Sequence, residues 1–227
     1  MYINGEDCKR NFIMYYNNRK YEDLLPISKK FVKELFPTIV EGDIVKCRYI
    51  NNGKVDIEMV FKNDKRRIMI KSGMNSVIHI EDFDNFCNFL KEIKVADYII
   101  KLIIKVHFSI DACALKEEKR VISEYLEKPR FLNLFLKRVL CDDYYHKEID
   151  YLYYGNVLSG KWIKVNDLKK TLLNYKNNHS HSALRIANIK MQRMILAKND
   201  SFFEDRCVFS IWNILSCIKL NEKDNIT

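Results

Sequence analysis

The fold of this chain is decided by residues 55–71, which read VDIEMVFKNDKRRIMIK. Apolar and polar side chains alternate on both sides of Asn63 and Asp64, as they do in two half-buried strands joined by a hairpin. With those two residues as the loop, paired positions sum to 127, so Ile57 faces Ile70 across the hairpin. The sequence therefore predicts two antiparallel strands with one apolar face.

The opposite face of this hairpin carries the charges. In the same register Asp56 lies opposite Lys71. An aspartate and a lysine at facing positions usually form a surface ion pair that contributes little to stability. They also suit phosphodiester hydrolysis, because a carboxylate can bind a divalent metal and a lysine can orient or deprotonate water. The register by itself leaves both interpretations open.

The segments around the hairpin predict a mixed central β-sheet flanked by helices, an α/β (α+β) fold. Pro26 opens a helix that ends before Pro37, and a β-branched segment over 43–50 predicts a strand. Residues 184–192 are expected to form a strand with Arg185 and Lys190 on its polar face, and 207–218 to form either strand or helix. Residues 72–76 are expected to form a loop, and helices are expected over 82–93, 95–140 and 165–176.

Length and composition favour one compact domain. Of 227 residues, 48% are hydrophobic and 30% are charged, which is enough apolar surface for a core and enough charge for solvation. No apolar run approaches the roughly 18 residues that span a bilayer, and the first residues do not resemble a secretory signal. The net charge of +9 and pI of about 9.1 favour a polyanionic partner such as nucleic acid.

Seven cysteines are present, an odd number, and no two have the spacing of metal ligands. Most lie in apolar stretches and are interpreted as small buried hydrophobes, which indicates a reducing cytoplasm. A zinc site would need long-range assembly. The tyrosines between Tyr151 and Tyr154 favour core packing over base stacking, and the loop from His179 to His181 has no acidic neighbour that would complete a metal site.

Three stretches of the chain, residues 55–71, 70–81 and 182–193, resemble the PD-(D/E)XK, or restriction-endonuclease-like, nucleases. Asp56 within residues 55–57, followed by Lys71 at the end of residues 68–71, is similar to that family's aspartate in one strand and acid-x-lysine in the next. Residues 70–81, IKSGMNSVIHIE, resemble a longer pattern in some type II restriction endonucleases. Residues 182–193 are similar to a late strand of such enzymes that ends in glutamine, here Gln192.

The resemblance implies a Mg²⁺ site held by Asp56 and the backbone carbonyl of Ile70, with Lys71 acting on the attacking water. The chain departs from the pattern at Met69, which stands where the family has an acid and cannot bind magnesium. Three carboxylates are candidate replacements. Glu81 closes the resembling string and is the replacement that the resemblance favours, as a metal ligand beside Asp56 and Ile70. Glu58 lies opposite Met69 in the predicted register, and Glu6 lies near the start of the first helix.

Polar residues after the lysine are candidate DNA contacts, because short polar side chains reach phosphates and base edges. Turn and helix-cap chemistry is the alternative for them, and an ordinary surface position is the alternative for the histidine. Lys190 and Gln192 of the late strand are further candidates. The full set is Ser72, Asn75, Ser76, His79, Lys190 and Gln192.

The function expected from the resemblance is sequence-specific cleavage of double-stranded DNA by a type II-like endonuclease. A homodimer is expected, because a palindromic site matches a two-fold axis. The catalytic core is expected over about 1–110, with a helical, DNA-recognising part over about 111–227. One alternative is an enzyme with the same core that acts in DNA repair, in mobile elements or on RNA. Another is a protein that binds DNA without cleaving it, and Met69 favours this one.

Overall fold

The computed structural model describes residues 5–50, 55–72, 75–109, 115–140, 149–175, 183–199 and 202–218. The chain forms two compact units whose segments alternate along the sequence. Unit 1 comprises Met1–Met74, Cys141–Leu168 and Ile214–Thr227, and unit 2 comprises Asn75–Leu140 and Lys169–Asn213. This division differs from the expected one into parts over about 1–110 and 111–227. Among the described residues, no helix combines the length and the apolar character that crossing a membrane requires.

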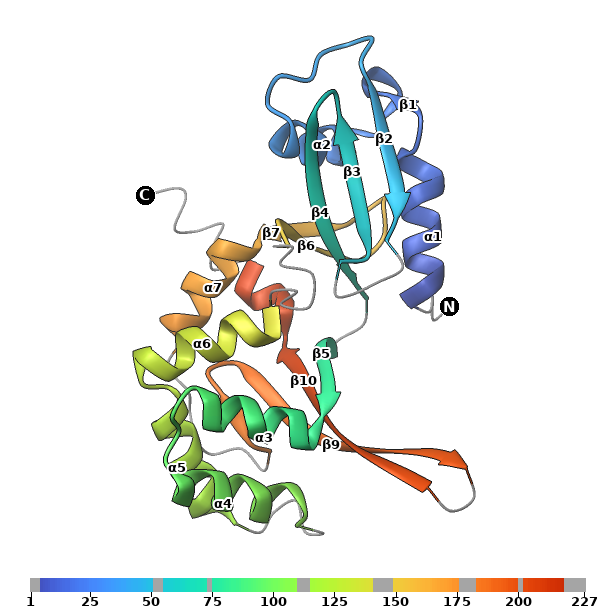
Figure 1. Cartoon of the computed structure of the whole chain (residues 1–227). Helices are drawn as coiled ribbons and strands as arrows, with labels where there is room; N and C mark the ends of the chain where they lie inside the picture. Colours follow the sequence, from blue (N-terminus) through green and yellow to red (C-terminus); the bar gives the residue numbers. More distant parts are fainter. Residues whose placement is uncertain are drawn as a thin grey trace. The chain divides into compact units, whose positions relative to one another are not determined.

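Unit 1 contains a six-stranded sheet, drawn in Figure 1. Its only parallel neighbours among the described strands are β4 and β6. The predicted class, a mixed sheet flanked by helices, is confirmed. In spatial order the strands are β1 (Arg19–Lys20), β2 (Ile44–Tyr49), β3 (Ile57–Phe61), β4 (Asp64–Lys71), β6 (Tyr151–Tyr154) and β7 (Lys161–Lys164).

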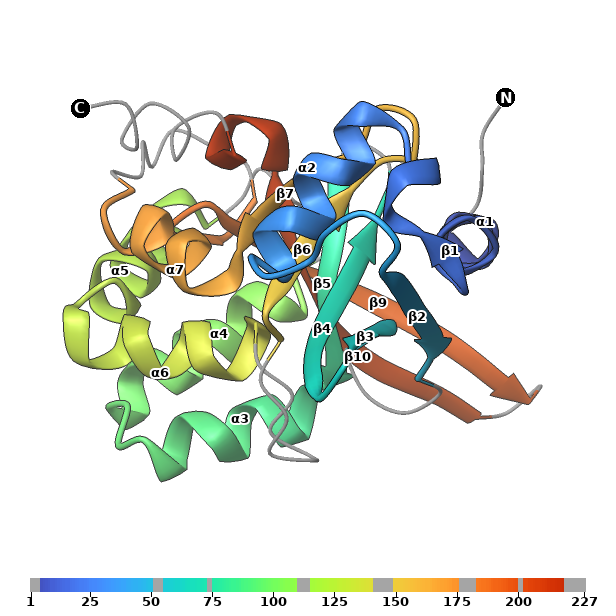
Figure 2. The same ribbon diagram turned by 90° about the horizontal axis from the view of Figure 1, so that it is seen from above.

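Helices α1 (Gly5–Tyr16) and α2 (Pro26–Leu35) bury aromatic rings against one face of this sheet. The ring of Phe31 on α2 lies 5.0 Å from that of Tyr153 on β6 and 4.9 Å from that of Trp162 on β7. Phe12 on α1 meets Tyr153 edge-on at 5.0 Å. The predicted core packing of Tyr151 and Tyr153 is confirmed, and Figure 2 shows α2 beside β6 and β7.

The predicted hairpin register is wrong by two residues. Phe61 pairs with Asp64 and Ile57 with Ile68, so the turn is formed by Lys62 and Asn63, and Lys62 takes a left-handed φ of 53°. A shift of two residues leaves each side chain on its predicted face, because strand side chains alternate with a period of two. The alternation therefore predicts the faces but cannot choose between these two registers.

Unit 2 contains a four-stranded antiparallel sheet with helices packed against it. Asp82 caps α3 by accepting hydrogen bonds from the backbone N–H groups of Asp84 and Asn85. The strands in spatial order are β5 (Asn75–Asp82), β10 (Phe202–Trp212), β9 (Ile189–Asn199) and β8 (Arg185–Ile186). The helices are α3 (Phe83–Glu92), α4 (Asp97–His107), α5 (Lys116–Leu126), α6 (Pro129–Leu140) and α7 (Val165–Leu173). They confirm the predicted helical regions. Helix α7 begins in unit 1 and ends in unit 2.

Two predictions in unit 2 need correction. The loop expected over 72–76 gives way to a strand from Asn75 onward, because β5 pairs with β10 along its length. The single strand expected over 184–192 is a hairpin. Ala187 adopts a φ of 51° and turns the chain between β8 and β9, which places Arg185 directly opposite Lys190.

Gly160 stands against the ring of Tyr153, at a position where an added Cβ would overlap the ring atoms. Tyr153 is 1% exposed, so its ring cannot move aside without disturbing the surrounding core. We therefore expect Gly160→Ala to lower the free energy of unfolding by about 1–3 kcal/mol, as overpacked cores do. Urea denaturation followed by circular dichroism measures it. Leu158→Ala, at a side chain 67% exposed in the same loop, is the control and should change stability little. Equal stability of both variants would contradict this packing.

Candidate functional site

Asp56 lies one residue before β3 and is bonded to β4 through both its backbone and its side chain. Its N–H donates to the carbonyl of Ile68 at 3.1 Å, and its Oδ2 accepts from the N–H of Ile70 at 2.7 Å. The carboxylate thus takes a place in the strand ladder that a backbone carbonyl would otherwise fill. Its side chain is 12% exposed.

Lys71 ends β4, where its carbonyl accepts a hydrogen bond from the N–H of Gly155 at 2.9 Å. Burial lowers the pKa of the Lys71 amine, the negative charge of Asp56 opposes that effect, and the positive charge of Lys9 adds to it. The two predicted residues therefore interact electrostatically. They do not face each other directly, because in the observed register the partner of Ile57 is Ile68.

Lys9 on α1 is part of this site, although the sequence analysis did not identify it. Its Nζ lies 2.7 Å from Glu6 Oε1 and 2.9 Å from Asp56 Oδ1. Burial acts to lower the pKa of Lys9, but the hydrogen bonds to the two carboxylates outweigh it and raise that pKa. The i,i+3 spacing of Glu6 and Lys9 was visible in the sequence, whereas the contact with Asp56 depends on tertiary packing.

Glu6 extends this group toward solvent. Hydrogen bonding to Lys9 lowers the pKa of Glu6, and its Oε2 accepts from the hydroxyl of Tyr49 at 3.2 Å. Its side chain is 63% exposed. We call Glu6, Lys9, Asp56 and Lys71 the acid–lysine cluster. Of the three candidate replacements for the missing acid, Glu6 is the one that the structure links to Asp56 through a shared partner.

Met69 and Glu58 do not meet as predicted. Met69 is 1% exposed and lies on β4 beside Leu152 of β6. Glu58 pairs across the sheet with Arg48 on one side and Arg67 on the other, and its carboxylate accepts from Arg48 Nε at 2.8 Å. The two-residue shift in register is the reason that Glu58 does not lie opposite Met69.

Glu81 belongs to unit 2, where both of its oxygens are engaged. Oε1 lies 2.8 Å from His79 Nε2, and Oε2 accepts from Arg138 Nη2 at 2.8 Å. Burial raises the pKa of Glu81, but the hydrogen bonds from His79 and Arg138 outweigh it and lower that pKa. His79 also stacks on Phe209, so it is a packed side chain that bonds to Glu81.

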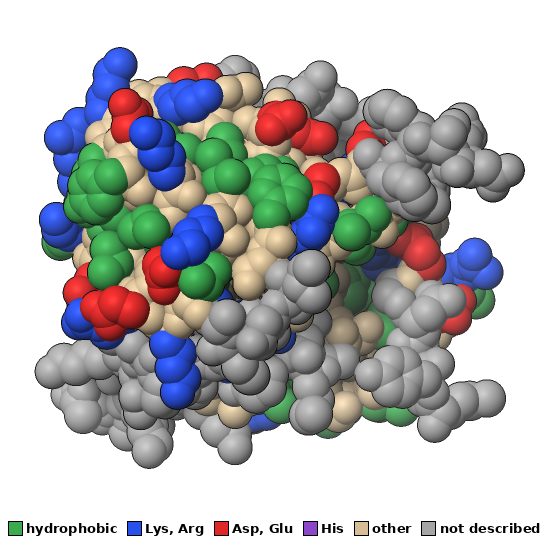
Figure 3. Space-filling view, turned by 90° about the horizontal axis from the view of Figure 1, so that it is seen from below, with side chains coloured by type: hydrophobic (Ala, Val, Ile, Leu, Met, Phe, Trp, Pro, Cys, Tyr) green, Lys and Arg blue, Asp and Glu red, His purple; other side chains and the backbone are tan. Residues whose placement is uncertain are grey.

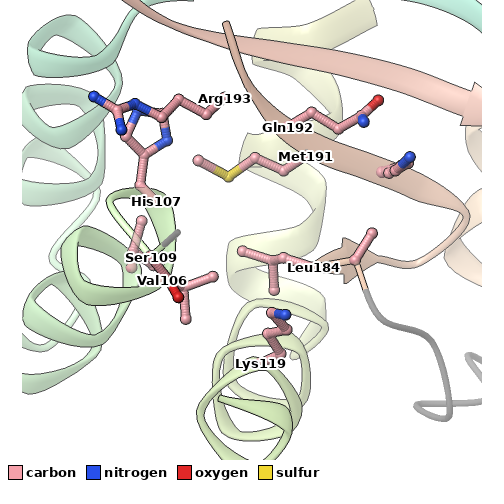
Figure 4. Close-up of a pocket in the computed structure, with 11 residues that line it drawn as sticks. Val106, His107, Ser109, Lys119, Leu184, Met191, Gln192 and Arg193 are labelled. Carbon is pink, nitrogen blue, oxygen red and sulfur yellow. The ribbon is translucent and has the colours of Figure 1, made fainter. Parts of the chain in front are cut away.

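The remaining predicted DNA contacts are distributed over both units. Ser72 follows β4 and is half-buried. Asn75 and Ser76 pair with Trp212 and Ile211 in the β5–β10 ladder, while their side chains lie outside the described part, as does the loop from His179 to His181. Lys190 and Gln192 lie on β9 and line a pocket of unit 2, shown in Figure 4.

The donor set of the acid–lysine cluster fits a small hard cation. Two carboxylates converge on one ammonium group, and magnesium takes one or two carboxylates together with water. Across the described ranges, no three or more His, Cys, Asp and Glu residues gather in a way that could hold a metal ion. Asp56 and Glu6 would therefore hold a magnesium ion here. Coordination by the backbone carbonyl of Ile70 stays a prediction.

Substitutions beside Lys71 should move its pKa in opposite directions. Asp56→Asn removes a negative charge and should lower the Lys71 pKa further, whereas Lys9→Met removes a positive charge and should raise it. Reductive ¹³C-methylation followed by NMR titration measures the amine, with Lys71→Arg to assign the signal. A Lys71 signal that titrates at the ordinary 10.5 in all variants would show that the cluster does not exist in solution.

Glu81 is expected to be a stabilising residue of unit 2. Glu81→Gln leaves Arg138 without its carboxylate and should cost about 3–5 kcal/mol at pH 7. Since the folded-state pKa is lowered, this contribution is present above the unfolded value near 4.5 and is lost as pH falls through the folded pKa. Denaturation at pH 7 and at pH 3 tests it. Glu117→Gln, in the exposed pair with Arg120, is the control and should leave stability unchanged. A Glu81→Gln penalty that persists undiminished at pH 3 would refute the assignment.

No protein-family model matches this chain, and no curated protein does. The contacts of the acid–lysine cluster and the resemblance of its surrounding residues are therefore the basis for a functional conclusion.

Proposed function

We propose that this protein is a magnesium-dependent endonuclease that cuts double-stranded DNA at specific sequences, as type II restriction enzymes do. The observation that carries the proposal is the position of the Asp56 carboxylate, which accepts a hydrogen bond from the N–H of Ile70, the residue directly before Lys71 at the end of β4. An aspartate followed by a lysine one strand later is the arrangement that the PD-(D/E)XK resemblance implies. A surface ion pair would leave both groups exposed, whereas Lys71 is half-buried and the Asp56 side chain is 12% exposed.

Lys9 supports the cation site, because its ammonium group lies between the carboxylates of Glu6 and Asp56. A magnesium ion between these carboxylates would have to displace this ammonium group. Magnesium bound by these two carboxylates would polarise a phosphate group and neutralise its charge. Glu6 is our choice for the acid missing at Met69, because Lys9 contacts both Glu6 and Asp56, whereas Glu81 contacts His79 and Arg138 within unit 2.

The residues of the chain would divide the reaction between them. The bond from Ile70 N–H fixes the Asp56 carboxylate relative to β4, so its other oxygen, which contacts Lys9, keeps a defined direction. Lys71 in its neutral form accepts a proton from the attacking water, and its lowered pKa enlarges that neutral fraction. The water oxygen bonds to phosphorus, the phosphorus–oxygen bond to the leaving group breaks, and the leaving oxygen takes a proton from solvent.

Charge supports a nucleic-acid substrate. The chain as a whole has a net charge of +9, which attracts the phosphates of nucleic acid. Figure 3 shows one face on which Lys and Arg side chains are interspersed with acidic and hydrophobic ones. On that face, the positive charge of the described residues is dispersed, so DNA contacts would come from separate basic positions.

A second candidate function is DNA binding without cleavage. The observation that favours it is Met69, which is buried at the position where the resemblance implies an acid. A protein of this kind would bind duplex DNA and leave it intact with magnesium present.

The homodimer and the cytoplasmic compartment belong to the same proposal. A palindromic target would favour a two-fold dimer, which analytical ultracentrifugation detects. Five described cysteines, Cys8, Cys47, Cys87, Cys207 and Cys217, are free thiols, and free thiols persist in a reducing compartment.

Cleavage of unmethylated plasmid and phage DNA with magnesium tests the function. We expect discrete fragments from the wild type, and a rate lower by about 10²-fold or more for Asp56→Ala and for Lys71→Ala, because each would remove a group that acts on the reacting atoms. Gel analysis of the products over time measures the rates.

Asp64→Ala and Lys65→Ala are matched controls, since they change the same residue types at the exposed turn end of β4. Both should cut at the wild-type rate. A wild type that is inert on varied DNA, or Asp56 and Lys71 variants that cut normally, would end the enzyme hypothesis. Binding of DNA without cutting would favour the second candidate.

A further inference from the structure

Unit 1 contains a pocket of about 290 Å³ between helix α1 and the loop that follows β6. The helix contributes Phe12 and the loop contributes Val157 and Leu158, so much of the lining is apolar. A cavity of this size lies near the lower end of those that hold small organic ligands. The lining is completed by Cys8, Asn11, Gly155 and Asn156.

This pocket lies at the same end of the sheet as the acid–lysine cluster. Strands β4 and β6 are parallel and pair Lys71 with Tyr154, so their carboxyl ends lie side by side. Gly155 follows β6 directly and donates its N–H to the carbonyl of Lys71 at 2.9 Å. On α1, Cys8 of the pocket directly precedes Lys9 of the cluster. The pocket and the cluster are therefore neighbours at the carboxyl end of parallel strands, which is where α/β sheets commonly bind ligands.

The loop wall of the pocket is held in place by hydrogen bonds. The hydroxyl of Tyr153 donates to the carbonyl of Asn156 at 3.1 Å, and the hydroxyl of Ser28 donates to the carbonyl of Val157 at 3.3 Å. The side-chain oxygen of Asn156 accepts from the N–H of Leu158 at 2.9 Å. Because this wall is already ordered, a ligand would bind without the entropy cost of arranging it.

Two side chains of the lining are exposed and available to a ligand. Asn11 is exposed, and within the described part of the chain its amide makes no hydrogen bond. An amide carries both donors and an acceptor, which are the groups that the edges of nucleobases pair with. Leu158 is 67% exposed although it is apolar. Proteins that unstack DNA bases insert apolar side chains of this kind between them.

We propose that this pocket receives one base of the DNA, turned out of the duplex, while a phosphate beside that base lies at the acid–lysine cluster. The apolar lining would contact the faces of the ring, and Asn11 would hydrogen-bond to its edge. Leu158 would occupy the space that the base leaves in the stack. The choice of DNA as the ligand rests on the proposed function. The pocket would give that function a means of selecting the base next to the cut.

Nucleosides test the pocket without any cleavage. In EDTA, the four deoxynucleosides compete with the fluorescent nucleoside of 2-aminopurine for the wild type, and fluorescence anisotropy gives each Kd. We expect at least one natural nucleoside to bind, and we expect Asn11→Trp to raise its Kd about tenfold or more, because the larger side chain obstructs the pocket and removes the amide. Met14→Trp is the matched control, since Met14 is 73% exposed on the same helix and lies outside the lining. A wild type that binds no nucleoside, or equal Kd values for the two variants, would overturn the site.

Alkylation of the wild type locates the ligand without any substitution. Cys8 lines the pocket and is 8% exposed, and Cys87 in unit 2 is a free thiol of similar exposure, 7%. A saturating nucleoside should slow the reaction of Cys8 with N-ethylmaleimide severalfold and leave that of Cys87 unchanged. Mass spectrometry of the peptides measures both rates. An unchanged rate at Cys8 would contradict the site, whether or not Asn11→Trp folds.

Duplexes that carry 2-aminopurine at successive positions of one bound sequence connect the pocket with DNA. This base fluoresces more strongly when it is unstacked, so the wild type should raise the signal at one position, and Leu158→Ala should lose most of that rise. If nucleosides bind but no position responds, the ligand is a free nucleoside and the DNA assignment is overturned. If DNA is cut but the pocket binds no base, the nuclease function stands and the pocket assignment fails. A protein that unstacks a base but never cuts would refute the nuclease function and leave the pocket assignment standing.

Discussion

The hydrogen bond from the N–H of Ile70 to the carboxylate of Asp56 is the interaction on which the candidate site depends. It closes the ladder between β3 and β4 where the backbone pairing ends, and it fixes one oxygen of the carboxylate. The other oxygen is then free to meet Lys9, which in turn holds Glu6. A side chain that completes a strand ladder is stationary, and a stationary carboxylate is what a catalytic or metal site requires.

The sheet of unit 1 follows from its sequence to a large extent. Alternation predicted the strands on both sides of Asn63, and Pro26 marked the start of α2 as expected. The register was wrong, because two registers that differ by two residues put the same side chains on the same faces. The choice between them depends on tertiary packing such as that of Phe61 against Phe36, at 5.7 Å between ring centroids, which local pattern does not contain.

The site was predictable in part. The residues that resemble a nuclease signature identified Asp56 and Lys71, and Glu6 was among three open alternatives for the missing acid. Lys9 was not found, since its contact with Asp56 joins residues far apart in the sequence. Glu81 was favoured by its place in the resembling string, yet its contacts with His79 and Arg138 arise from β5 and α6, which only the fold brings together.

The parallel pairing of β4 and β6 has a consequence for how the chain folds. These two strands are neighbours in one sheet, yet residues 72–150 separate them, and most of that connection belongs to unit 2. During synthesis, the β2–β4 meander leaves the ribosome with one edge of β4 unpaired until Tyr151–Tyr154 follow. Contacts between residues so distant in sequence form slowly, and an open strand edge invites pairing with other chains. The long connection therefore leaves that edge of β4 open to pairing with other chains while unit 2 is still being made.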